Sequence, residues 1–141
     1  MGEDMKNLAS CTPTEFLKQT SKIKRSVEKW LKVTDIMAIR KRVPANLPEI
    51  DKSAPVAEQG EVIAKRAEML REQAYKNVSV ILDAMLEEHP EETLEVLAHC
   101  CFVEPEHVDC HTMSEYIGSI NEMLSDESVK GFFTTLMSLV Q

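Results

Sequence analysis

Glycine and aromatic residues are scarce in this chain. Its 141 residues include four glycines, one tryptophan, two tyrosines and four phenylalanines. Few glycines and few β-branched runs argue against a sandwich or a barrel and favour helices. Eight methionines indicate a mostly aliphatic, adaptable core. The length is that of one domain. We therefore predict an all-α protein, a small helical bundle with a long central helix, a Pro-rich linker and short antiparallel C-terminal helices.

Long apolar runs are also missing. No stretch approaches the roughly 20 apolar residues that a helix needs to cross a bilayer. The first six residues, Met-Gly-Glu-Asp-Met-Lys, lead into no apolar signal core. Lys6 stands where an N-terminal myristoylation motif requires Ser or Thr. We therefore expect a cytoplasmic protein with no membrane partner.

Positive charge is in deficit overall, and it is unevenly distributed. The formal net charge is −8, which makes nucleic acid an unlikely general partner because phosphate binding needs a positive field. Residues 16–42, however, contain nine basic residues against two acidic ones, and residues 44–141 contain six against nineteen. Such asymmetry indicates charge-guided contact with partners or with further copies of the chain.

The N-terminal residues, 1–43, are expected to form a basic amphipathic helical segment. Thr12 and Glu15 have the spacing of a capping box, and Pro13 suits a first helical position. Apolar residues follow at helical spacing. A short segment, 35–42, continues this helix or kinks away from it, and Pro44 ends it.

The remaining chain divides into a linker and an acidic helical part. Three prolines mark 44–55 as a Pro-rich linker with little regular structure. Residues 56–141 are expected to form an acidic helical bundle, and together with the N-terminal segment one domain overall. Its long first helix ends before Pro90 and carries a nearly continuous apolar stripe: Ile63, Ala67, Leu70, Ala74, Val78, Ile81, Leu82 and Met85.

No residue cluster has the spacing of a known chemistry. The best metal-ligand candidates are His99, Cys100, Cys101, Cys110 and His111. Adjacent cysteines on a helix point about 100° apart, and no C-x-x-C pair exists, so packed thiols are favoured over zinc. A Cys–His nucleophile would also need an orienting third group. The glycines are isolated and form no phosphate loop. We expect no catalytic residue, no metal and no cofactor.

Basic residues around a tryptophan form the most suggestive surface. One interpretation is an ordinary solvated face, a second is a docking face for an acidic protein, and a third is contact with nucleic acid or membrane. Trp30 lies on the apolar stripe of its helix, which favours a place in the core. The candidate partner-binding residues are Lys22, Arg25, Lys29, Trp30, Arg40, Lys41 and Arg42.

Seven segments together carry a family pattern: 12–20, 30–31, 34–36, 39–42, 89–94, 101–105 and 129–133. Across most of the chain they resemble the tail assembly chaperones, small proteins of the tail-gene cassettes of phages and prophages of Gram-positive bacteria. The resemblance implies a non-enzymatic, mostly helical protein of the host cytoplasm. Such chaperones bind the long tape measure protein and keep it soluble until tail tube protein polymerises around it. Related members are often made in two lengths by a ribosomal frameshift.

Other functions remain open at this stage. The chain is alternatively a structural tail or head-completion component that stays in the virion, or a small regulator whose basic helix contacts nucleic acid. The opposed charges of the two halves also make a homo-oligomer an expected state. A tape measure protein is long and helical, so its binder needs an amphipathic helix face or groove, which this sequence offers.

Overall fold

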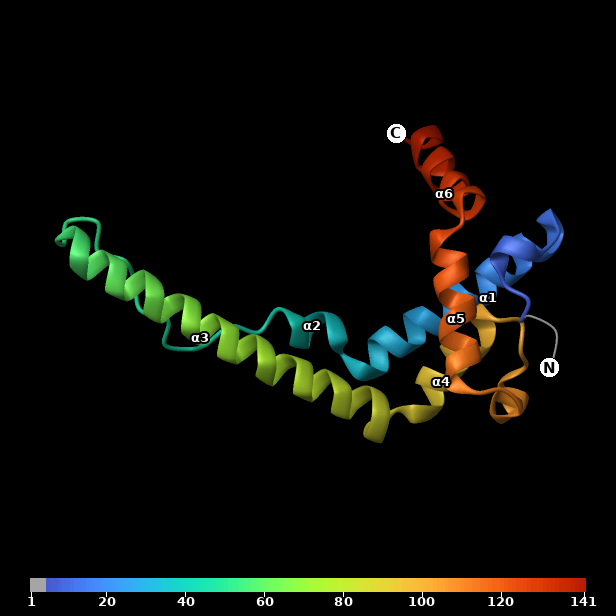
Figure 1. Ribbon diagram of the computed structural model, residues 1–141, viewed down its shortest axis with the longest axis horizontal. Helices are drawn as coiled ribbons and strands as arrows, with labels where there is room; N and C mark the ends of the chain where they lie inside the picture. The colour runs from blue at the N-terminus through green and yellow to red at the C-terminus, as the bar shows by residue number, and fades with distance from the viewer. Residues whose placement is uncertain (1–4) are drawn as a thin grey trace. The chain divides into compact units, whose positions relative to one another are not determined.

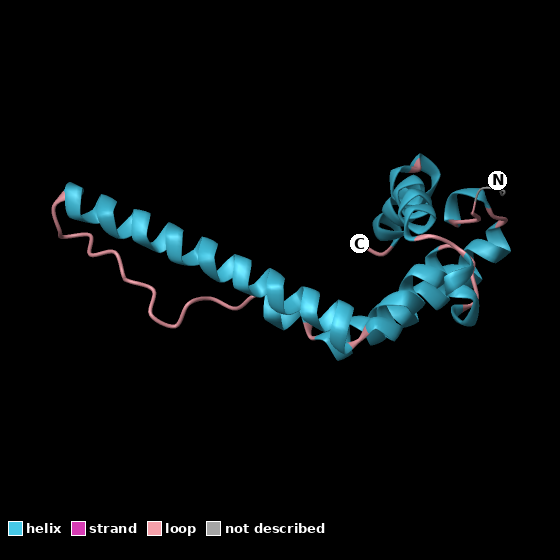
Figure 2. Ribbon diagram, turned by 60° about the horizontal axis from the view of Figure 1, so that its bottom comes forward, coloured by secondary structure: helices cyan, strands magenta, loops and turns pink. Residues whose placement is uncertain are grey.

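The computed structural model describes residues 5–141, and within that range the chain forms helices and no strand (Figures 1 and 2). The prediction of an all-α protein with a long central helix is confirmed. The chain divides into two compact units. Unit 1 contains the chain up to Trp30 and again from Pro90 onward, and unit 2 contains Leu31–His89. Most of the basic first helix therefore belongs with the C-terminal helices, while the linker belongs with the long helix.

Unit 1 contains five helical elements and most of a sixth. These are the short helix η1 (Leu8–Ser10), α4 (Pro90–Cys100), η3 (Pro105–Cys110), α5 (Met113–Ser125), α6 (Glu127–Leu139) and most of α1 (Pro13–Thr34). Capping boxes begin α1 and α5. Thr12 Oγ1 accepts from the Glu15 amide at 3.2 Å, and Thr112 Oγ1 accepts from the Glu115 amide at the same distance. The reciprocal bonds to both Glu side chains satisfy amides that a helix start leaves unpaired.

The core of unit 1 is built from η1, α4, α5 and α6. Tyr116 of α5 is buried, and its hydroxyl donates to the carbonyl of Val108 at 2.7 Å, so its polar tip is satisfied. The buried residues of this cluster are Leu8, Cys100, Cys101, Tyr116, Met123 and Val129. Cys100 and Cys101 thus act as small apolar groups, as the favoured interpretation of these thiols predicted.

A buried amide fixes the N-terminal segment to α5. Asn7 is fully buried, and its side-chain nitrogen donates to the Ser119 carbonyl at 3.2 Å, the Ser119 hydroxyl at 2.9 Å and the Glu122 carboxylate at 3.3 Å. Its side-chain oxygen accepts from the Ala9 amide at 2.8 Å and so caps η1. Three bonds from this one side chain therefore join residues that are 112 and 115 positions apart.

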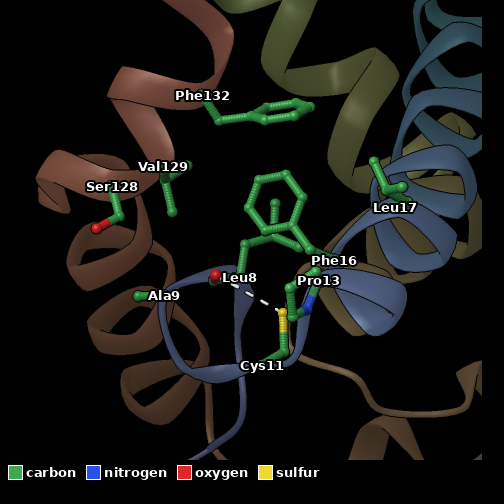
Figure 3. A pocket seen from close by; sticks show the side chains of 9 residues that line it. All are labelled: Leu8, Ala9, Cys11, Pro13, Phe16, Leu17, Ser128, Val129 and Phe132. Carbon is green, nitrogen blue, oxygen red and sulfur yellow. Dashed lines mark hydrogen bonds between the residues drawn. The ribbon is translucent and has the colours of Figure 1, made fainter.

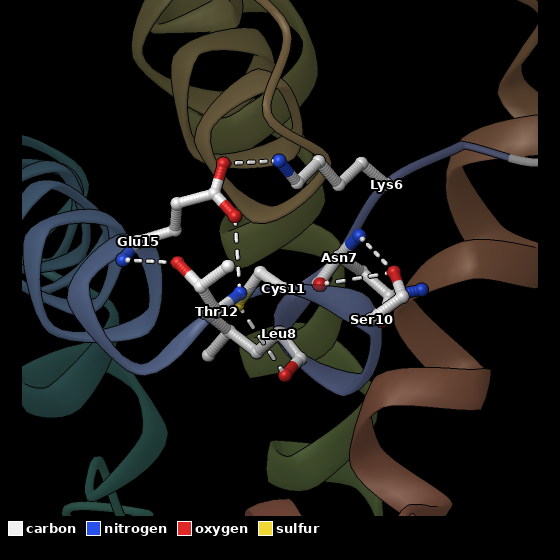
Figure 4. A network of polar contacts seen from close by, with 7 residues as sticks. All are labelled: Lys6, Asn7, Leu8, Ser10, Cys11, Thr12 and Glu15. Carbon is white, nitrogen blue, oxygen red and sulfur yellow. Dashed lines mark hydrogen bonds and ion pairs between the residues drawn. The ribbon is translucent and has the colours of Figure 1, made fainter.

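Short polar contacts continue from this amide into the start of α1 (Figure 4). The backbone of Asn7 exchanges hydrogen bonds with Ser10, and Lys6 pairs with Glu15. The Lys6 ammonium and the Thr12 amide lower the pKa of Glu15 to about 2. Glu15 therefore stays ionised, and its capping role persists, at any physiological pH.

Unit 2 pairs a long helix with an irregular segment. The elements are α2 (Ile36–Arg40), α3 (Val56–Asp83) and η2 (Ala84–Glu88), a π-helical turn that ends before Pro90. Asp35 separates α1 from α2 in the left-handed region, with φ of 55°. The helix is therefore interrupted here, and the alternative of a kink holds over that of continuation. The linker is irregular, as predicted, and both views show it running beside α3 (Figures 1 and 2).

Side chains of α3 satisfy carbonyls of the linker and its start. Gln59 donates to the Ala54 carbonyl at 2.7 Å, Arg66 to the Pro48 carbonyl at 2.8 Å and Asn77 to the Arg42 carbonyl at 3.0 Å. These donors are spaced seven and eleven residues apart, so they share one helix face. They replace the ladder of backbone bonds that an irregular, Pro-rich segment cannot form.

The predicted apolar stripe of α3 lies on another face and is largely exposed. Ile63 is 52% exposed and Val78 53%, whereas Asn77 is 6% exposed. The apolar periodicity of α3 therefore does not mark the face that packs. The face next to the linker carries the donors Gln59, Arg66 and Asn77.

Replacing Asn7 by Ala removes a buried hub and leaves the Ser119 hydroxyl and the Ala9 amide without their partner. Leaving buried polar groups unpaired typically costs about 1–3 kcal/mol, so we expect the free energy of unfolding to fall by that amount. Urea denaturation followed by circular dichroism measures it. Asn121→Ala, an exposed change on α5, is the control and should leave the midpoint unchanged. Equal midpoints for the two variants would contradict the role given to Asn7.

Replacing Arg66 and Asn77 together by Ala should loosen the linker, since two of its carbonyl contacts are lost. We expect trypsin to cut after exposed Lys52 several-fold faster than in the parent chain, because local opening controls cleavage. Arg71→Ala, at an exposed position of the same helix, provides the control. A cleavage rate that does not change would show that the linker is held by other contacts.

Candidate protein-binding surface

The predicted partner-binding residues fall into two groups that belong to different units. Lys22, Arg25 and Lys29 are exposed on α1 in unit 1. Arg40, Lys41 and Arg42 are exposed at the end of α2 in unit 2. The structure therefore brings together only the first three, and the candidate surface is built around them.

Trp30 supports the fold of unit 1. It is half-buried, and its indole nitrogen donates to the Thr93 hydroxyl of α4 at 2.9 Å. The buried Ser26, one turn earlier on α1, and the buried Gln19, three turns earlier, also face inward, and Gln19 donates to the His99 carbonyl at 2.6 Å. Trp30 is thus packed against α4 and does not extend the exposed basic face.

A shallow groove of about 410 Å³, called here the basic groove, lies between α1 and α4. The Lys29 ammonium pairs with the Glu95 carboxylate at 3.4 Å. The Arg25 guanidinium donates to the Ser21 hydroxyl at 3.3 Å, on its own helix. The lining residues of the groove are Lys22, Arg25, Ser26, Lys29, Glu95, His99 and Glu104.

His99 forms part of the wall of this groove as a neutral group. Burial lowers the pKa of His99, with Glu95 opposing that effect. Among residues 5–141 nothing hydrogen-bonds to its buried Nδ1 atom. The imidazole therefore adds no positive charge at neutral pH, and the cationic character of the groove comes from α1 alone.

A second groove, the apolar groove, opens at the beginning of α1 (Figure 3). It has a volume of about 450 Å³ and is formed by η1, α1 and α6. The Phe16 ring lies 4.9 Å from the Phe132 ring in an edge-to-face arrangement, which fixes one side of it. The lining residues are Leu8, Ala9, Cys11, Pro13, Phe16, Leu17, Ser128, Val129 and Phe132.

A third hollow, the middle groove, joins the other two along α1. It is lined by Leu17, Lys18, Ser21, Lys22 and Arg25 and measures about 400 Å³. It shares Leu17 with the apolar groove and shares Lys22 and Arg25 with the basic groove. Consecutive grooves thus share lining residues; the three together are called here the α1 track, and their lining changes from apolar to basic along α1.

Sequence reasoning found the basic end of the α1 track and missed the apolar end. Leu8 and Phe132 lie far apart in the chain, and nothing local indicates that they face each other. One signal was available. Leu17 is a large aliphatic residue on the otherwise polar face of α1, and it is 60% exposed.

Two of the candidate metal-ligating cysteines are buried in the core. Burial raises the pKa of Cys100 to about 11, with the neighbouring Cys101 adding to the shift. Burial also raises the pKa of Cys101. Because the thiolate is the nucleophile and the metal ligand, burial of these thiols works against both roles. Across residues 5–141 no group of three or more His, Cys, Asp or Glu side chains is placed to hold a metal ion.

No helix within residues 5–141 is long and apolar enough to cross a membrane. Comparisons with models of protein families, with curated proteins and with solved structures find no match to this chain. The candidate surface therefore has to be interpreted from its own geometry and charge.

Thiol labelling separates the buried cysteines from the exposed one. At pH 8 we expect a disulfide reagent to modify exposed Cys110 first and Cys100 last. A pKa two units above its usual value reduces the thiolate fraction of Cys100 roughly 100-fold, and burial blocks access as well. Mass spectrometry of the digested protein locates the label. In urea all four thiols should react together, and fast labelling of native Cys100 would contradict the packing described here.

Proposed function

We propose that this chain is a non-enzymatic assembly chaperone of a bacteriophage tail, which binds the tape measure protein and keeps it soluble during assembly. The observation that supports this proposal is the α1 track, an open surface that joins an apolar groove to a basic one. Concave apolar surfaces rimmed by polar groups are typical of protein-binding sites. The sequence resemblance to tail assembly chaperones names the client.

Further exposed apolar surface fits a chaperone better than a solitary globular protein. The last turns of α6 expose large side chains, with Met137 at 59% and Leu139 at 76%. Together with the exposed stripe of α3, they give the chain several apolar helix faces. Methionine-containing faces of this kind repack against varied segments, which a binder of a long repetitive client requires.

The chemistry of the chain is in keeping with binding alone. The thiols at 100 and 101 are buried and protonated, and the isolated glycines provide no phosphate loop. The proposed location is the cytoplasm of the bacterial host, where tape measure protein is made. The opposed charges of the basic α1 segment and the acidic remainder favour contact between neighbouring copies along the client.

Coexpression with the products of the neighbouring genes tests the proposal. We expect the tagged chain to retain a very long helical protein that is insoluble without it, since burial of exposed apolar faces prevents aggregation. Mass spectrometry identifies the retained protein. A matched expression without the chain shows whether solubility depends on it.

The same measurement distinguishes the alternative of a virion component. A chaperone is absent from purified particles, whereas a structural tail or head-completion protein is present in them. Recovery of finished tail or capsid proteins, or presence of the chain in particles, would contradict the chaperone function.

A further inference from the structure

The two ends of the α1 track have opposite chemical preferences. The apolar end is walled by Phe16, Leu17 and Phe132. The basic end gathers its cations from α1, with Lys22 and Arg25 outside any salt bridge to an acidic residue in residues 5–141. A surface that is apolar at one end and cationic at the other selects a partner with the complementary order.

The basic end of the α1 track carries an excess of positive charge, which favours the acidic end of a partner. The middle and basic grooves together are lined by four cations, Lys18, Lys22, Arg25 and Lys29, against the carboxylates of Glu95 and Glu104. This excess occurs in a chain whose formal net charge is −8. Lys29 is already paired with Glu95, so Lys18, Lys22 and Arg25 remain to attract carboxylates. The occupant of the basic end is therefore acidic.

Distance along α1 sets the spacing within the occupant. From Leu17 to Lys22 and Arg25 the helix advances five and eight residues, or about 8 and 12 Å at 1.5 Å per residue. On a helix lying alongside, side chains four and seven residues apart project from the same face. One bulky apolar side chain and carboxylates one to two turns away therefore reach both ends of the track.

From this juxtaposition we propose that the α1 track binds a helical segment of another protein, anchored by a bulky apolar side chain in the apolar groove and by carboxylates one to two turns away on Lys22 and Arg25. The helical form of the occupant rests on the proposed function, which gives the chain a helical client. The apolar anchor supplies most of the affinity, and the charges fix direction and register.

A labelled synthetic helix tests the track without the client. The probe is a fluorescein-labelled 20-residue peptide, rich in Ala and Gln, with Leu at position 4 and Glu at positions 8 and 11. A second peptide carries the same residues in reverse order. Anisotropy with the full chain gives the dissociation constant of each. Peptides with Leu replaced by Ala, or with Glu replaced by Lys, report the two ends separately.

Substitutions on the protein have close controls. Leu17→Glu should weaken binding at least tenfold, whereas Leu124→Glu should not, although both leucines are 60% exposed.

The double substitution Lys22→Glu and Arg25→Glu should weaken binding about tenfold at low salt, and the loss should shrink at high salt as screening grows. The control is the double substitution Lys24→Glu and Lys32→Glu, which changes the net charge equally at two residues that line no part of the track. All six substituted positions are exposed, so the circular dichroism spectra of the variants should match that of the parent chain.

Binding that both track variants weaken, and that the controls preserve, supports the proposal. No binding of either peptide, or equal binding by all variants, overturns it. Self-association of the chain that the track variants abolish and the peptide cannot displace also overturns it, in favour of a second copy as occupant. Capture of the client in the coexpression experiment is measured separately from peptide binding. Peptide binding without capture rejects the chaperone function alone, and capture that survives both track variants rejects the track alone.

Discussion

Unit 1 depends on one buried amide. Asn7 holds η1 against α5 through three acceptors on Ser119 and Glu122, and it caps η1 with its own oxygen. A fully buried amide is stabilising only when its polar atoms are paired, so this arrangement permits a single placement of η1. Because Leu8 follows immediately, the same bonds position one wall of the apolar groove beside Phe16 and Phe132. The shape of the candidate surface is thus set by a polar residue outside it.

Local signals in the sequence predicted the elements well. Both capping boxes, the Pro44 and Pro90 boundaries and the irregular linker follow from the chemistry of a few adjacent residues, and local chemistry survives whatever tertiary structure forms. The packing face of α3 did not follow from its apolar periodicity. There the carbonyls of a Pro-rich segment required donors, and Gln59, Arg66 and Asn77 turned a less apolar face inward. Periodicity indicates which face is apolar, but not which neighbour the helix has to satisfy.

The candidate surface was predictable only at one end for a similar reason. Basic residues at a spacing of three to four positions are visible in any helix, so Lys22, Arg25 and Lys29 stood out. The apolar end combines η1 and the start of α1 with α6, which lies more than a hundred residues further along the chain. Trp30 showed the opposite case, since its partner Thr93 removes it from the exposed face. Arg40, Lys41 and Arg42 belong to the other unit, and sequence proximity alone had grouped them with α1.

The hydrogen-bond donors and the exposed apolar stripe of α3 occupy different parts of the helix surface. On this 28-residue helix, some 42 Å long, the stripe residue Val78 projects about 100° from the donor Asn77, and Ile63 about 60° from the donor Arg66. The hydrogen bonds to the linker therefore leave the apolar stripe of α3 exposed. A helix arranged in this way can hold its own linker and still offer an apolar face to a second body, so that neither contact has to be given up for the other to form.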